Sequence, residues 1–192
     1  MTKEFKRDDL LFSLCGLNCS LCPMYVRKLC TGCIKDSICY EICNIVPCSL
    51  EHGVIDYCFE CEEYPCSKYD EVDQHDSLMT HINQLTDMEK AKNMGIEKYN
   101  MLQHQKVDIL NIFLENYNPG NNKEVFYCTA VNLLPLDDLI DLTDNLDNLT
   151  DNMSLEEKYT YIKNKLFDCA KNNRIKIELR KEKYNNERIS FD

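Results

Sequence analysis

The sequence predicts an α+β protein, in which an irregular N-terminal region packs on a mostly helical C-terminal region with one or two short strands. Two observations support this division. Eleven of the thirteen cysteines lie between positions 15 and 66, a stretch that three glycines and three prolines interrupt, so long helices are not expected there. Beyond position 80, apolar residues recur at helical spacing. We therefore divide the chain into residues 1–70 and residues 71–192.

Start and stop signals place several helices in the second region. Thr86 with Glu89, and Ser154 with Glu157, match the capping-box pattern of a helix N-terminus. Gly95 is a typical helix end, and Pro135 is a typical opening residue. Between them, the spacing predicts one more helix, with an apolar face made of Ile96, Tyr99, Leu102, Ile109, Ile112 and Phe113.

Two segments favour strands. The run at 125–131 (VFYCTAV) is short and continuously apolar, which is typical of a buried strand. At 174–180, three apolar residues alternate with charged ones, which is typical of a half-buried strand.

Composition excludes several classes of protein. The net charge is -11 and the pI is about 4.8, so the chain repels phosphate backbones, and nucleic acid is not expected as a partner. A membrane helix needs about 18 apolar residues in a row, and no segment approaches that length. The first residues lack the apolar run of a signal sequence. We therefore expect a cytoplasmic protein, whose thiols are kept reduced.

The cysteine spacing points to metal ions held by thiolates. Three pairs have two intervening residues, a spacing that lets one tight turn aim both sulfurs at a tetrahedral ion. An odd, clustered set in a reducing compartment argues against a disulfide framework. The predicted metal ligands are Cys15, Cys19, Cys22, Cys30, Cys33, Cys39, Cys43, Cys48, Cys58, Cys61 and Cys66. We expect metal, rather than hydrocarbon, to form the core of this region.

An internal repeat supports this interpretation. Residues 43–49 and 61–67 both read C-x-x-x-P-C-S, eighteen positions apart, and a proline before a cysteine restricts how that ligand approaches. The repeat predicts two similar metal-holding loops.

The order of the cysteines leaves open which sulfurs share an ion. Eleven is not a multiple of four, so the set is completed by Cys128, by a histidine (His52, His75 or His81), or not at all, with one cysteine free. The buried-hydrophobe interpretation competes for Cys128 and is favoured for Cys169.

Zinc in closed four-thiolate sites fits the spacing best, and the function that follows is a binding or regulatory module for a protein or small-molecule partner. An iron–sulfur redox protein or metalloenzyme is the alternative, because such clusters also take four thiolates. A soft-metal reservoir is a third possibility. An open zinc site, with His75 or His81 as a ligand and Glu62 or Glu63 as base, has weaker support, and no catalytic residue is assigned.

The motifs resemble a known family. Residues 15–25 (CGLNCSLCPMY), 30–33 (CTGC) and 43–66, with its C-F-E-C-E-E-Y-P-C ending, are similar to the cysteine-rich proteins of domain-of-unknown-function family 3795. Residues 94–97 and 126–136 resemble a branch of the same family. The resemblance implies a cytoplasmic prokaryotic protein with a metal-bearing N-terminal region. It gives more weight to Cys128 and implies no catalytic residues.

Overall fold

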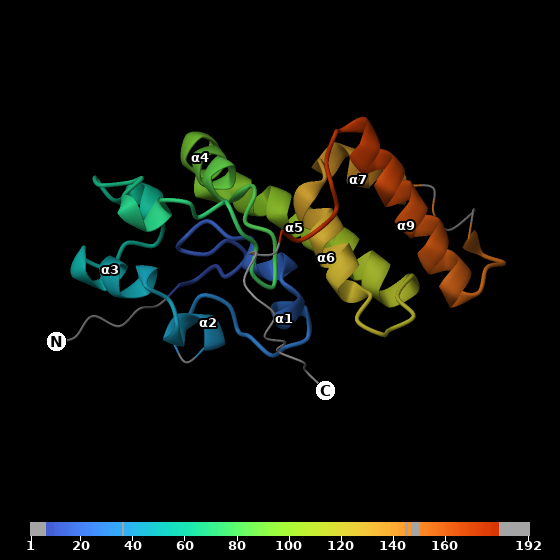
Figure 1. The fold of residues 1–192 in the computed structure, drawn as a ribbon, viewed down its shortest axis with the longest axis horizontal. Helices are drawn as coiled ribbons and strands as arrows, with labels where there is room; N and C mark the ends of the chain where they lie inside the picture. The colour runs from blue at the N-terminus through green and yellow to red at the C-terminus, as the bar shows by residue number, and fades with distance from the viewer. Residues whose placement is uncertain (1–6, 36, 145, 147–149, 181–192) are drawn as a thin grey trace.

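The computed structural model describes residues 7–35, 37–144, 146 and 150–180, and within these residues every regular element is a helix. Short helices occupy the cysteine region and long helices the remainder (Figure 1). The short ones are the 3-10 helices η1 (Cys19–Leu21), η2 (Cys58–Glu60) and η3 (Ser67–Tyr69), and the α-helices α1 (Pro23–Val26), α2 (Ile38–Glu41) and α3 (Ile45–Glu51). The long ones are α4 (Gln84–Met94), α5 (Ile96–Asn116), α6 (Glu124–Leu133), α7 (Leu136–Thr143) and α9 (Leu155–Asn172).

The α+β prediction is wrong, because neither predicted strand forms in the described residues. Residues 125–131 lie inside α6, in which every residue from Tyr127 to Leu133 is buried. A helix covered on all sides and a buried strand give the same continuous apolar run, so periodicity did not separate them. The second predicted strand covers residues 174–180. Of these, residues 175–180 have no regular secondary structure. The alternation there reflects Ile175 and Ile177 packing on the helical core.

Most helix boundaries follow the sequence signals. The Ser154 hydroxyl accepts a hydrogen bond from the Glu157 amide, and the Glu157 carboxylate accepts one from the Ser154 amide at 2.8 Å, so this capping box is confirmed. Gly95, with φ at 86°, ends α4, and Pro135 directly precedes α7. The capping box predicted at Thr86 is wrong, because α4 begins two residues earlier, at Gln84.

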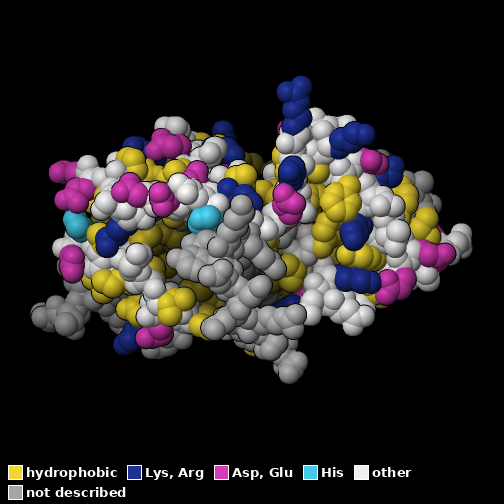
Figure 2. All heavy atoms as spheres, viewed as in Figure 1, with side chains coloured by type: hydrophobic (Ala, Val, Ile, Leu, Met, Phe, Trp, Pro, Cys, Tyr) yellow, Lys and Arg dark blue, Asp and Glu magenta, His cyan; other side chains and the backbone are white. Residues whose placement is uncertain are grey.

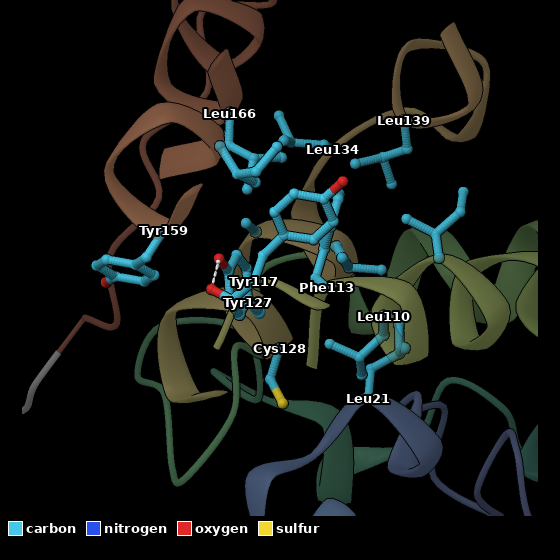
Figure 3. Close-up of a cluster of buried hydrophobic side chains, with 14 of the residues drawn as sticks. Leu21, Leu110, Phe113, Tyr117, Tyr127, Cys128, Leu134, Leu139, Tyr159 and Leu166 are labelled. Carbon is cyan, nitrogen blue, oxygen red and sulfur yellow. Dashed lines mark hydrogen bonds between the residues drawn. The ribbon is translucent and has the colours of Figure 1, made fainter. Parts of the chain in front are cut away.

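The long helices enclose a hydrophobic core with aromatic residues at its centre (Figure 3). Phe113 from α5 stacks on Tyr127 from α6 with ring centroids 5.3 Å apart. The Tyr127 hydroxyl donates to the carbonyl of Tyr117 at 2.8 Å, which satisfies its buried polar atom. Leu139 of α7 and Leu166 of α9 are fully buried and belong to the same core. This core makes the helical layer a rigid support for the cysteine region.

The cysteine region has a hydrocarbon core of its own. Phe12 is fully buried, with its ring centroid 4.6 Å from that of Tyr99 and 6.0 Å from that of Tyr57. Met88 of α4 lies in the same cluster. Burying one side chain of this size contributes about 1.5–3 kcal/mol. The expectation that metal alone forms the core of this region is therefore too strong.

Asn18 joins the first cysteine motif to three long helices. Its side-chain amide donates to Asp87 of α4 at 2.9 Å and to Asn132 of α6 at 3.0 Å. Its oxygen accepts from the Tyr99 hydroxyl of α5 at 2.9 Å. Asn18 is 3% exposed, so the network is shielded from water. Because buried polar groups need partners, this one residue fixes how residues 15–22 sit on the helical layer.

The network predicts a large effect of a small substitution. Asn18→Ala leaves polar groups of Asp87, Tyr99 and Asn132 with fewer partners in a buried place, and we expect the free energy of unfolding to fall by about 2–4 kcal/mol. Denaturant unfolding of the reduced protein measures this change. Asn164→Ala, on the exposed side of α9, is the control, with an expected change within about 0.5 kcal/mol. Equal effects of the two substitutions would contradict the role given to Asn18.

The segment after α9 runs back toward the middle of the molecule (Figure 1) and is fixed there by an ion pair between the partly exposed Arg180 and the buried side chain of Asp76. The Arg180 guanidinium donates to both carboxylate oxygens of Asp76, at 2.8 and 3.2 Å, and the Arg180 backbone amide donates at 2.6 Å. The Asp76 amide donates in return to the Arg180 carbonyl at 2.9 Å. Burial acts to raise the pKa of Asp76, but the hydrogen bonds from Arg180 and from the His81 amide outweigh it and hold this pKa below its ordinary value.

This ion pair predicts a pH-dependent contribution to stability. Because the pKa of Asp76 is lower in the folded than in the unfolded chain, its stabilisation is complete above the unfolded value of about 4 and is lost as pH falls through the folded value. The stability difference between wild type and Asp76→Asn should therefore shrink below about pH 4. Urea unfolding at a series of pH values measures it, and a difference that stays constant into acid would contradict the assignment.

Candidate metal centre

Seven of the predicted ligands line one cavity of about 300 Å³. They are Cys15, Cys19, Cys22, Cys30, Cys33, Cys39 and Cys43, which we call the cavity set. The other lining residues are largely apolar, and the polar groups on their side chains are hydroxyls. These residues are Ser13, Leu17, Met24, Tyr25, Gly32, Tyr40, Ile42, Val46, Ser77, Leu78 and Met79. The cavity therefore combines many sulfur donors with largely apolar walls.

Tight turns position these thiols. Gly16 and Gly32 both have φ at 93°, a conformation that residues with a Cβ atom rarely adopt. A Cβ atom on Gly16 would lie 2.3 Å from the Cγ atom of Met88 and 3.0 Å from the Gln84 carbonyl oxygen, so any other residue there would clash with α4. Cys22 directly precedes α1, with Pro23 as the first residue of that helix. The cysteine, glycine and proline spacing thus sets the directions of the sulfurs.

Backbone amides donate to two of these sulfurs. The Gly32 amide donates to the Cys30 sulfur and the Ile45 amide to the Cys43 sulfur, both at 3.4 Å. In both cases the donor lies two residues after the cysteine. Because such donors favour the charged thiolate, which is the form that binds metal, the backbone is arranged for thiolate ligands.

Without a cation, the cavity nevertheless favours the protonated form of the Cys15, Cys19 and Cys39 thiols, whose pKa values it raises. Burial raises the pKa of Cys15 to about 11. The hydrogen bond with the Ser13 hydroxyl acts to lower this pKa, and the neighbouring Cys33 and Cys43 act to raise it. Burial and the nearby Cys30 raise the pKa of Cys39 to about 12. Burial likewise raises the pKa of Cys19. A divalent ion reverses this balance, because its charge favours deprotonation of every ligand that it contacts.

The remaining four predicted ligands gather beside the cavity set. Cys48 from α3 lies near Cys61 and Cys66, and Cys58 from η2 lies near Cys48 and Cys66. We call these four the peripheral cluster. Burial raises the pKa of Cys58 to about 12, and its neighbours include Cys15, so the two groups adjoin.

The repeat does not give two similar loops. Cys43 lines the cavity, whereas Cys48 lies in α3 within the peripheral cluster. In the second copy, both Cys61 and Cys66 belong to the peripheral cluster, and the backbone between them is not helical. The prediction of two similar loops is therefore wrong, because the first copy is helical from Ile45 onward, whereas the second is not helical before Ser67.

The structure also places the residues proposed to complete a site. The His52 ring nitrogen Nδ1 lies 3.6 Å from the Cys48 sulfur. Cys128 is 1% exposed, and its sulfur points from α6 toward the 3-10 helix that carries Leu21 (Figure 3), on the side of Cys22. His81 pairs with the Ser77 hydroxyl at 2.8 Å, and His75 is exposed. Cys169 lies apart, 3.6 Å from a carboxylate oxygen of Asp138.

A finished coordination shell is not formed in this conformation. Nowhere in the residues that the structure describes do three or more His, Cys, Asp or Glu side chains come close enough to hold one ion together. Zinc–sulfur bonds are about 2.3 Å long, so binding requires the thiols to come closer together than they are in this structure. The metal ligands and the choice of zinc therefore remain predictions.

Sequence reasoning missed two features of the site. The Asn18 network carries a weak signal, since a polar residue sits between two ligands of the C-G-L-N-C motif. Residues 77–79, which form part of the cavity wall, carry none, because they lie eleven or more positions after the last predicted ligand.

The comparisons with known proteins bear on the cysteine region. Residues 11–71 match a family model described as "Protein of unknown function (DUF3795)". This confirms the resemblance over the cysteine motifs, while residues 94–97 and 126–136 lie outside the match. Neither the curated proteins nor the solved structures contain a significant match to the chain. Among the helices that the structure describes, none is both long and apolar enough to cross a membrane.

Proposed function

We propose that the DUF3795 segment of this chain, residues 11–71, is a zinc-binding module that works in a reducing compartment such as the cytoplasm. The observation that carries this proposal is the shared cavity with its seven thiols. The donor set fits the metal: sulfur ligands, backbone amides that favour thiolates, and apolar walls that keep water from competing.

The two groups of cysteines suggest three ions. Two tetrahedral zinc ions have eight coordination positions, and the seven thiolates of the cavity set fill them when one sulfur bridges both ions or when Cys128 joins the set. The peripheral cluster has four cysteines, enough for a third ion, with His52 beside it as a further donor.

The module serves binding or regulation rather than nucleic-acid recognition. The chain carries a net charge of -11, and zinc bound to four thiolates adds negative charge. On the face shown in Figure 2, basic and acidic side chains are intermingled, without the single-sign basic surface that phosphate backbones favour. We propose a protein or small-molecule partner.

An iron–sulfur cluster is the second candidate, because its ligands are also thiolates that gather in one cavity. A single cavity with more than four thiols also suits a polynuclear cluster. The two candidates differ in colour and in the element bound, so one measurement separates them.

Metal analysis of anaerobically purified, chelator-free protein should find three zinc ions per chain and no visible absorption. Replacing two peripheral ligands, in Cys61→Ser with Cys66→Ser, should remove one ion and leave two, because the cavity set keeps its donors. Cys169→Ser is the matched control and should keep all three.

Protein without stoichiometric metal would contradict the proposed function. Loss of every ion from the Cys61 and Cys66 variant would contradict the division into two groups. Iron with visible absorption that bleaches on reduction would favour the iron–sulfur candidate.

A further inference from the structure

One stretch of the cavity wall comes from outside the cysteine region. Of the residues that line the cavity, all lie between positions 13 and 46 except Ser77, Leu78 and Met79. Met79 is 5% exposed and faces inward, while Leu78 is 52% exposed and lies at the rim. Ile42, also on the lining, is 83% exposed. The mouth of the cavity therefore lies where residues 77–79 meet α2 and the residue that follows it.

Asp76 organises this stretch. Its carboxylate oxygen Oδ1 accepts hydrogen bonds from the His81 amide at 2.7 Å and from the Thr80 hydroxyl at 3.4 Å. The Ser77 amide donates to the Met79 carbonyl at 3.1 Å, and the Ser77 hydroxyl pairs with His81 at 2.8 Å. Residues 76–82, which we call the wall loop, thus form a unit built around one carboxylate.

Arg180 holds the wall loop from outside. The Asp76 side chain is 0% exposed, and Arg180 supplies its cationic partner, through two guanidinium bonds and one backbone bond. The segment that carries Arg180, residues 175–180, has no regular structure. A segment without helix or strand bonds detaches at a lower free-energy cost than the helices beneath it.

We propose that the wall loop is a gate over the cavity set and that Arg180 keeps it closed, so that the C-terminal segment controls how metal ions and thiol reagents reach the cavity. This rests on the proposed function for its biological meaning. Removing the Arg180 side chain would leave the Asp76 carboxylate with the hydrogen bonds from the Arg180 and His81 amides and the Thr80 hydroxyl but without its cation, and a shielded charge in that state favours movement of its loop toward water. Movement of the wall loop exposes the cavity set but not the peripheral cluster.

Thiol labelling of the full, reduced chain tests the gate. The metal-free wild type and Arg180→Ala are exposed to iodoacetamide, and mass spectrometry of peptides follows each cysteine. We expect the cysteines of the cavity set other than Cys39, which is already exposed, to react about tenfold faster in Arg180→Ala, with Cys48, Cys61 and Cys66 unchanged. General destabilisation would instead accelerate both groups, so the peripheral cysteines are an internal control.

Zinc transfer provides the second readout. The rate at which zinc passes from the loaded protein to a chromophoric chelator is measured for each variant. In Arg180→Ala, two ions should leave faster than in wild type, and the third should leave at the wild-type rate. Glu178→Gln is the matched control, since it removes a charge from the same segment at an exposed pair with Lys176, and it should change neither rate. Arg180→Lys keeps the charge but loses the two-pronged contact, and it should give an intermediate labelling rate.

Three results would overturn the gate: equal acceleration of both groups of cysteines in Arg180→Ala, wild-type labelling of the cavity set in that variant, or the same acceleration in Glu178→Gln. If Arg180→Ala does not fold, an Arg180→Lys variant that folds and labels like wild type would overturn it also. Labelling of the metal-free chain needs no zinc, so the gate and the proposed function fail by separate results.

Discussion

The arrangement of this protein depends on seven thiols that face one largely apolar cavity. Such thiols have little to bond to except one another and a few backbone amides, and burial holds the pKa of Cys15 and of Cys39 far above neutrality. A cation changes them from weak hydrogen-bonding groups into ligands with strong, directional bonds. The cavity is built in advance by hydrocarbon packing around Phe12, and metal binding would then lock its walls.

The helical layer acts as a template for that cavity. Besides the bonds of Asn18, the side-chain amide of Gln84 donates to the carbonyl of Cys15 at 2.8 Å, and the Tyr69 hydroxyl donates to the same carbonyl at 3.2 Å. Gly16 allows Met88 to pack directly against this turn. The first ligand of the motif is therefore positioned by α4 and by the residues after the peripheral cluster. Contacts with α4 and Tyr69 thus fix the geometry of the first cysteine motif.

Much of the helical region was predictable because its signals are local. Ser154 with Glu157, Gly95 and Pro135 each specify a helix end through contacts within a few residues. The secondary structure of residues 125–131 could not be predicted from local signals, because a buried helix and a buried strand have the same apolar run and only packing against the helices around α6 distinguishes them. The glycines and prolines of the cysteine region predicted that it has no long helix, which is confirmed for its described residues. The cysteine spacing did not predict which sulfurs lie together. Asp76 and Arg180 are 104 positions apart, so no signal in the sequence indicated that they pair.

The central claim, that cysteine thiolates close around metal ions in residues 11–71, is tested most directly by X-ray absorption at the edge of the bound metal. For the purified wild-type protein, the account predicts zinc with four sulfur neighbours at about 2.3 Å and no substantial oxygen shell. A first shell dominated by nitrogen or oxygen, or a protein that binds no metal at all, would contradict it.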